Sequence, residues 1–112
     1  MPEIDSELEL ALNYLDHNKD ESLKRLFDIL KIPSISTQEK YSKDCLNAAN
    51  WFVEQLQDIG FDASIRETNG HPMVVAHFEQ EGPHFLFYGH YDVQPIDPIE
   101  LWNHDPFEPK IE

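Results

Sequence analysis

Apolar residues in the first half of the chain recur at helical spacing, in two sets separated by polar residues. The first set is Leu8, Ala11, Leu12 and Leu15, and the second is Leu23, Leu26, Phe27 and Leu30. Ser6 and Glu9 have the spacing of a capping box, which predicts that the first helix begins close to Ser6. The second helix is predicted to begin near residues 18–20 and to end before Pro33, because a proline disfavours helix in the residue that precedes it.

A third and longer helix is predicted after the connector formed by residues 31–35. Ser36 and Glu39 again have the spacing of a capping box, so this helix is expected to begin near Ser36 or Thr37 and to end at Gly60. Its apolar stripe comprises Cys45, Ala49, Phe52, Val53 and Leu56.

Beyond Gly60 the hydrophobic period changes to that of β-strands. Residues 61–65 and 73–78 are predicted to form a hairpin, with a tight primed turn at 69–70. Residues 85–88 follow a short link and are expected to form a third, antiparallel strand, buried on both faces because it lacks alternation. The predicted fold class is α/β: N-terminal helices followed by a three-strand meander, with helices covering at least one face.

Composition narrows the class of protein further. A chain of 112 residues with 40% hydrophobic content predicts a single domain over residues 1–112. The net charge of −14 disfavours nucleic acid and anionic membrane surfaces as partners. Because the sequence shows neither a signal peptide nor an apolar run long enough to span a membrane, a cytoplasmic location is expected. The single cysteine, Cys45, is expected to pack in the core.

The best candidates for a chemical role lie where the predicted third strand ends. His90 follows the apolar run directly, and Asp92 comes two residues later. A zinc-bound imidazole commonly donates its second ring N–H to a carboxylate, which fixes its orientation, so this pair suits one metal ligand and its partner. The two-residue pattern taken alone is weak and favours a surface histidine.

The neighbouring sequence makes the pattern more specific. Residues 89–95, together with the preceding strand and residues 102–107, resemble the N-terminal catalytic segment of the dinuclear zinc peptidase and deacylase family. That family includes carnosine-type dipeptidases, aminoacylases, acetylornithine deacetylases and succinyl-diaminopimelate desuccinylases. The resemblance extends to the connector at residues 31–36, and the variants at Tyr91 and Gln94 are most similar to the dipeptidase branch.

The resemblance implies specific roles for two residues. His90 is expected to bind one of two zinc ions, with manganese or cobalt also compatible, and Asp92 is expected to act as the catalytic residue that orients it. The remaining ligands and the general base are expected beyond residue 112. Residues 1–112 are thus expected to be the N-terminal part of a larger zinc-peptidase-like α/β catalytic domain, without the rest of that domain and without the lid and dimerisation domain.

The resemblance further implies the activity of the parent protein. That activity would be hydrolysis of the peptide or N-acyl amide bond of a dipeptide or N-acyl amino acid. The chain alone is expected to bind metal weakly and to show little or no hydrolysis, because one histidine cannot hold a two-metal centre.

Two alternatives were weighed against this interpretation. One is a non-catalytic folded module that self-associates through exposed sheet edges, forming a homodimer. The other extends the metal site to His104, which a loop could bring to the metal. Structural or surface roles are expected for the remaining histidines, which are His17, His71, His77 and His84. A nicotinamide or ATP enzyme is disfavoured because no glycine-rich phosphate loop follows any predicted strand.

Overall fold

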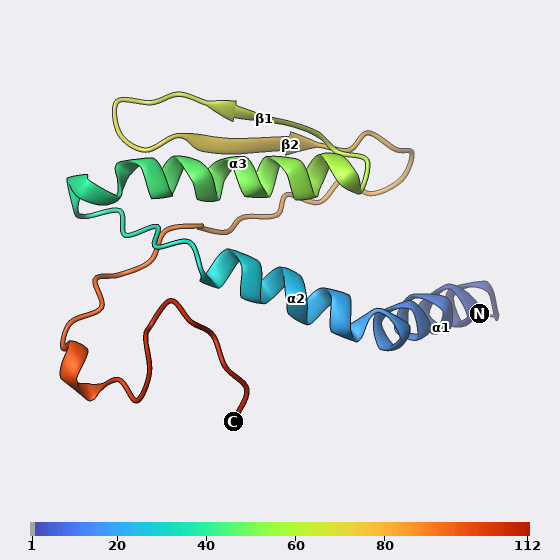
Figure 1. The fold of residues 1–112 in the computed structure, drawn as a ribbon. Coiled ribbons are helices and arrows are strands. Elements are labelled where there is room, and N and C mark those ends of the chain that lie inside the picture. Colours follow the sequence, from blue (N-terminus) through green and yellow to red (C-terminus); the bar gives the residue numbers. More distant parts are fainter. Residues whose placement is uncertain (1) are drawn as a thin grey trace.

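The computed structural model describes residues 2–112 and shows helices followed by an antiparallel pair of strands (Figure 1). The elements are α1 (Pro2–His17), α2 (Lys19–Leu30), η1 (Glu39–Tyr41), α3 (Ser42–Asp58), β1 (Asp62–Arg66), β2 (Met73–His77) and η2 (Ile99–Leu101). This order confirms the predicted α/β class. None of the helices within residues 2–112 is long and apolar enough to cross a membrane.

The molecule is much more open than a closed domain of its length. Its radius of gyration is 17.4 Å, whereas about 13 Å is typical of a compact domain of this size. Its accessible surface is 9621 Å², against roughly 6400 Å² for a folded monomer of the same mass. Large apolar side chains therefore remain exposed along several elements.

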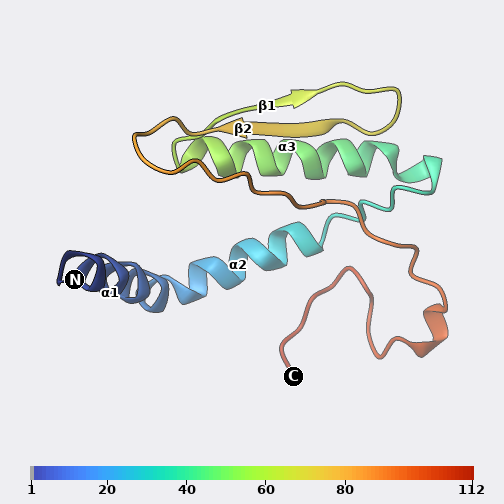
Figure 2. The same ribbon diagram turned by 180° about the vertical axis from the view of Figure 1, so that it is seen from behind.

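Helices α1 and α2 follow each other end to end, joined at Asn18, and extend away from the rest of the molecule (Figures 1 and 2). The predicted bounds of α2 are confirmed, but the capping box at Ser6 is wrong, because α1 already begins at Pro2. Proline is compatible with the first turn of a helix, so residues 2–5 extend α1 upstream of Ser6. Leu8, Leu12 and Leu15 are each more than half exposed, so the apolar stripe of α1 is largely uncovered.

Helix α3 begins six positions later than the predicted capping box would place it, and it ends as predicted. Its C-terminus is a Schellman motif, in which the Gly60 N–H donates to the Gln57 carbonyl at 3.0 Å and the Phe61 N–H donates to the Leu56 carbonyl at 2.9 Å. Gly60 has a φ of 99°, which a side chain would disfavour. The chain therefore leaves α3 in a fixed direction, toward β1.

The β1–β2 hairpin packs on α3 and provides most of the small core. Pairing runs from Asp62 opposite His77 to Arg66 opposite Met73, and Ala48, Ala49 and Ala63 are buried between helix and sheet. Residues 67–72 form the loop, and the predicted primed turn is wrong because no residue in this loop has a positive φ. The Thr68 hydroxyl instead closes the loop, donating to the His71 carbonyl and accepting from the Gly70 N–H.

The predicted third strand does not form in this structure. Residues 85–88 run back in the direction opposite to β2 and pass below α3 in both views (Figures 1 and 2), but they pair with no strand among the described residues. Their side chains are 86% to 95% exposed, so the expected burial on both faces is also wrong. An apolar run without alternation needs cover on two faces, and the described residues supply it on neither.

Candidate metal-ligand site

The segment that follows His90 is held against the connector between α2 and α3. Ile35 and Val93 form a parallel β-bridge, and the Val93 N–H donates to the Ser34 carbonyl at 3.0 Å. The Ser34 hydroxyl donates to the Tyr91 carbonyl at 2.8 Å. Ser34 and Ile35 are only 2% and 1% exposed, so the connector fixes this segment from within the core.

The hairpin loop holds the same two segments from the other side. The Tyr91 hydroxyl donates to the Pro72 carbonyl at 2.6 Å, and His71 Nε2 lies 2.7 Å from the Ser36 carbonyl. Because a carbonyl oxygen only accepts, His71 Nε2 carries the hydrogen of this contact. The loop, the connector and the segment after His90 thus form one hydrogen-bonded unit.

Both oxygens of the Asp92 carboxylate have partners within this unit. Oδ2 accepts a hydrogen bond from the Ser36 hydroxyl at 2.7 Å, and Oδ1 lies 3.0 Å from His90 Nδ1. The hydrogen bond from Ser36 is the largest cause that holds the pKa of Asp92 below its ordinary value, and His90 lowers it further, while partial burial opposes the shift. Asp92 is therefore ionised over the whole neutral range.

His90 is oriented by Asp92 and otherwise open to solvent. Its Nδ1 lies 3.0 Å from both the Asp92 side-chain Oδ1 and the Asp92 backbone carbonyl. Since both oxygens are acceptors, Nδ1 carries a hydrogen, and in the neutral imidazole Nε2 then has a free lone pair. The side chain of His90 is 74% exposed, so this lone pair is accessible to an incoming metal ion.

The pair stands between two open depressions in the surface, and His90 and Asp92 line both of them. The larger, of about 610 Å³, is mainly apolar, and the smaller, of about 490 Å³, adjoins Ser36. The apolar lining of the larger depression includes Ile29, Leu30, Phe52, Trp102 and Phe107.

No family model matches the chain, but several known proteins are similar to it in sequence or structure. A Cys-Gly metallodipeptidase of Candida albicans is 28% identical over 89% of this chain and 24% of its own length. A succinyl-diaminopimelate desuccinylase of Bordetella avium is 34% identical over 73% of this chain and 20% of its own length. The solved structure of the dipeptidase Dug1p from Saccharomyces cerevisiae matches 84% of this chain and 22% of its own, with a TM-score of 0.72 and 28% identity.

This chain is a relative of those metallodipeptidases and desuccinylases. The resemblance predicted from the sequence is confirmed, and dipeptidases appear both among the sequence relatives and as the structural match. The chain spans less than a quarter of the length of the metallodipeptidase and of Dug1p, at 24% and 22%.

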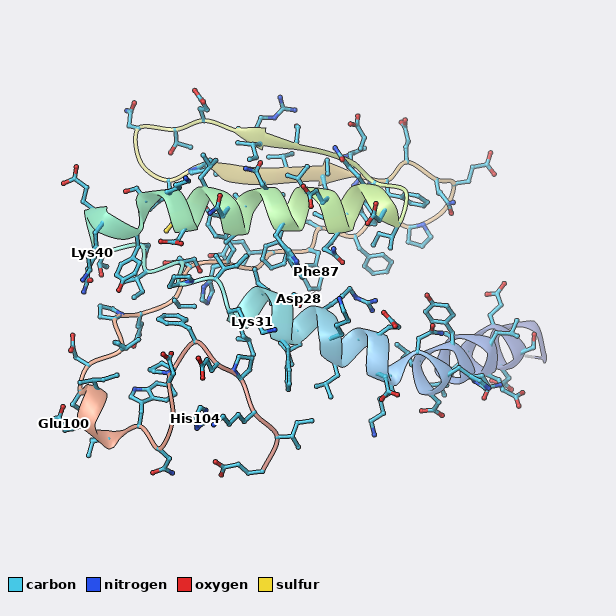
Figure 3. All side chains as sticks on the ribbon, viewed as in Figure 1. Asp28, Lys31, Lys40, Phe87, Glu100 and His104 are labelled. Atoms are coloured by element: carbon cyan, nitrogen blue, oxygen red, sulfur yellow. The ribbon has the colours of Figure 1, made fainter. Side chains whose placement is uncertain are left out.

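The structure brings the two predicted site residues together, but it adds no third ligand to them from the part of the chain that it describes. Within residues 2–112, no group of three or more histidine, cysteine, aspartate or glutamate side chains is placed to hold a metal ion. His104 lies in the C-terminal segment, with its ring centroid 6.5 Å from that of Trp102 (Figure 3). His77 and His84 face each other, with ring centroids 5.5 Å apart.

Sequence reasoning missed Ser36 as the partner of Asp92. The two residues are 56 positions apart, and the local pattern at Ser36 matched a capping box instead. No local pattern in the sequence signals this contact, because the partners are far apart and the spacing of Ser36 to Glu39 fits a capping box.

Proposed function

We propose that this chain supplies one metal ligand and its orienting carboxylate to a metal-dependent hydrolase of peptide or N-acyl amide bonds. The observation that carries the proposal is the His90–Asp92 pair, in which Nδ1 faces Asp92 at 3.0 Å and Nε2 remains free. This is the arrangement expected of a histidine that ligates a metal through Nε2, and zinc, manganese and cobalt all accept imidazole.

The chain's own residues perform the positioning part of this chemistry. Asp92 keeps the proton on His90 Nδ1, and the hydrogen bonds of Ser34 and Tyr91 fix the backbone on which both side chains stand. A divalent metal, when bound, supplies Lewis-acid polarisation of the scissile carbonyl and activates water for attack. Further ligands and a general base would come from polypeptide outside these residues, since one histidine does not complete a two-metal site.

The substrate class follows from the names of the relatives. One is a Cys-Gly dipeptidase and another removes succinyl groups from diaminopimelate, so a dipeptide or an N-acyl amino acid is the proposed substrate. The apolar depression beside His90 is a suitable place for an uncharged side chain or acyl group.

Zinc titration of the 112-residue chain tests the proposal, with the histidine ring signals followed by NMR. Zinc is expected to perturb His90 first and to bind weakly, and His90→Ala is expected to abolish that binding. His104→Ala is the matched control, because His104 contacts the Trp102 ring rather than Asp92, and it is expected to bind zinc as the unmodified chain does. Unchanged zinc binding in His90→Ala would contradict the proposal, as would tight binding of two ions per chain.

A second candidate function is self-association through strand edges, and the exposure of residues 85–88 favours it. These apolar side chains are 86% to 95% exposed, and the two-stranded sheet leaves edges open for pairing with a second copy. Size-exclusion chromatography with light scattering, with and without zinc, separates the two functions. A dimer that forms without zinc and is lost in Phe87→Ser favours association, whereas a monomer in all conditions excludes it.

A further inference from the structure

Ser36 makes a long-range contact with Asp92, which lies 56 positions further along the chain. Its hydroxyl donates to Asp92 Oδ2 at 2.7 Å, and it does not cap α3, whose N-cap residue is Tyr41. A serine ahead of a helix usually bonds to the first free backbone N–H groups. Here the hydroxyl is directed instead to the carboxylate that faces the proposed metal ligand.

The position of Ser36 is itself fixed by its surroundings. Its backbone carbonyl accepts the hydrogen bond from His71 Nε2 at 2.7 Å. The preceding residue, Ile35, is 1% exposed and forms the bridge with Val93. The donor is therefore held by the connector and by the hairpin loop, independently of Asp92.

The Asp92 carboxylate, by contrast, has few other restraints. Its side chain is 45% exposed, and the only side-chain partners it has within the described residues are Ser36 and His90. Without the Ser36 hydroxyl, Oδ2 would form a hydrogen bond to water. The carboxylate could then rotate about χ2, a torsion whose preferred angles are broadly distributed for aspartate. His90 Nδ1 would then lose one of its two acceptors and keep only the Asp92 backbone carbonyl.

We propose that Ser36 is a positioning residue that fixes the Asp92 carboxylate, so that Asp92 holds the proton on His90 Nδ1 and leaves Nε2 free for a metal. This inference rests on the proposed function, in which His90 binds a metal. Residues that directly orient a metal ligand, as Asp92 would, typically change metal affinity about 10- to 100-fold when mutated. Ser36 acts through Asp92, one contact further from the metal, so an effect of about 3- to 10-fold is expected.

The connector provides a matched control for this hydroxyl. Ser34 lies two residues away, is 2% exposed, and donates to the Tyr91 backbone carbonyl rather than to the carboxylate. Ser34→Ala therefore removes a buried hydrogen bond from the same unit without touching Asp92. Ser36→Thr keeps the hydroxyl, and Ser36→Cys keeps the size of the side chain with a much weaker donor.

The experiment measures the tautomer of His90 in the metal-free chain by nitrogen-15 NMR, above the usual imidazole pKa, and then the zinc dissociation constant. In the unmodified chain and in Ser36→Thr, the Nδ1–H tautomer is expected to dominate. In Ser36→Ala, the population is expected to shift toward Nε2–H, and zinc binding is expected to weaken about 3- to 10-fold. Ser34→Ala is expected to lower the melting temperature and to shift the tautomer less than Ser36→Ala does, because its hydrogen bond goes to the backbone and not to the carboxylate.

The outcomes separate this inference from the proposed function. An unchanged His90 tautomer in folded Ser36→Ala overturns the positioning role, whatever zinc does, and so does an equal shift in Ser34→Ala. Should Ser36→Ala not fold, Ser36→Cys gives the same test, and a tautomer identical to that of Ser36→Thr overturns the proposal. Zinc that binds equally well in His90→Ala contradicts the proposed function instead, while the tautomer shift would still establish the contact.

Discussion

Two segments that lie next to each other in the chain behave in opposite ways. Residues 91–93 are fixed by the connector and the hairpin loop through hydrogen bonds to Ser34, Ser36 and Pro72. Residues 85–88 are more apolar, yet their side chains are 86% to 95% exposed and form no strand. The difference teaches that hydrophobicity alone does not order a segment, because apolar side chains need a surface to pack on. The segment after His90 is ordered because its polar groups have hydrogen-bond partners within the chain.

The largest loss of stability is expected from a substitution of the core residue that contacts residues 91–93. Ile35→Ala should reduce the free energy of unfolding by about 2–5 kcal/mol, because Ile35 is 1% exposed and forms the bridge to Val93. Urea denaturation followed by circular dichroism measures the change. Leu101→Ala is the control, since Leu101 is 76% exposed, and an equal loss in both variants would contradict the assigned core.

A smaller loss of stability is expected at low pH. It tests the hydrogen bonds that fix residues 91–93. The pKa of Asp92 is lowered in the folded chain, so its contribution to stability is present above the ordinary value of about 3.8 and is lost as the pH falls through the lower, folded value. The contribution should be less than about 1 kcal/mol, because the carboxylate is nearly half exposed. The measurement is the pH dependence of urea denaturation, and Asp92→Asn should lack this part of it. A variant with the same acid profile as the unmodified chain would contradict the lowered pKa.

The smallest effect is expected in the exposed segment. Phe87→Ser should change the free energy of unfolding of the monomer by no more than about 0.5 kcal/mol, because the Phe87 side chain is 95% exposed (Figure 3). Dilute samples in urea denaturation isolate the monomer. A loss as large as that of Ile35→Ala would show that residues 85–88 are packed in solution, and would remove the contrast between the two segments.

The parts of this fold that follow local rules could be predicted from the sequence. Helix spacing located α2, and Gly60 marked the end of α3, because both depend on residues close together in the chain. The pattern at His90 and Asp92 also predicted their contact correctly, since the two residues are only two positions apart in the chain. Residues 85–88 could not be assigned correctly, because strand formation depends on neighbours that the local sequence does not reveal.

Long-range polar contacts were the other part that the sequence did not reveal. The hydroxyl of Ser36 had two possible uses, as a helix cap or as a partner of Asp92, and its spacing to Glu39 favoured the wrong one. Tyr91 likewise reaches Pro72, 19 positions away, through a backbone carbonyl that carries no sequence signal. Such contacts depend on how the connector and the hairpin loop meet.

The hairpin loop sets a limit on changes of chain length near the site. Surface loops usually tolerate insertions and deletions, but His71 and Pro72 at the end of this loop contact Ser36 and Tyr91 directly. Residues added near Gly70 would leave the spacing of His71 and Pro72 to β2 unchanged, and with it their contacts to Ser36 and Tyr91. A deletion at position 71 or 72 would displace both contacts together. The hairpin can therefore vary in length at its tip while its C-terminal end must keep its spacing to β2.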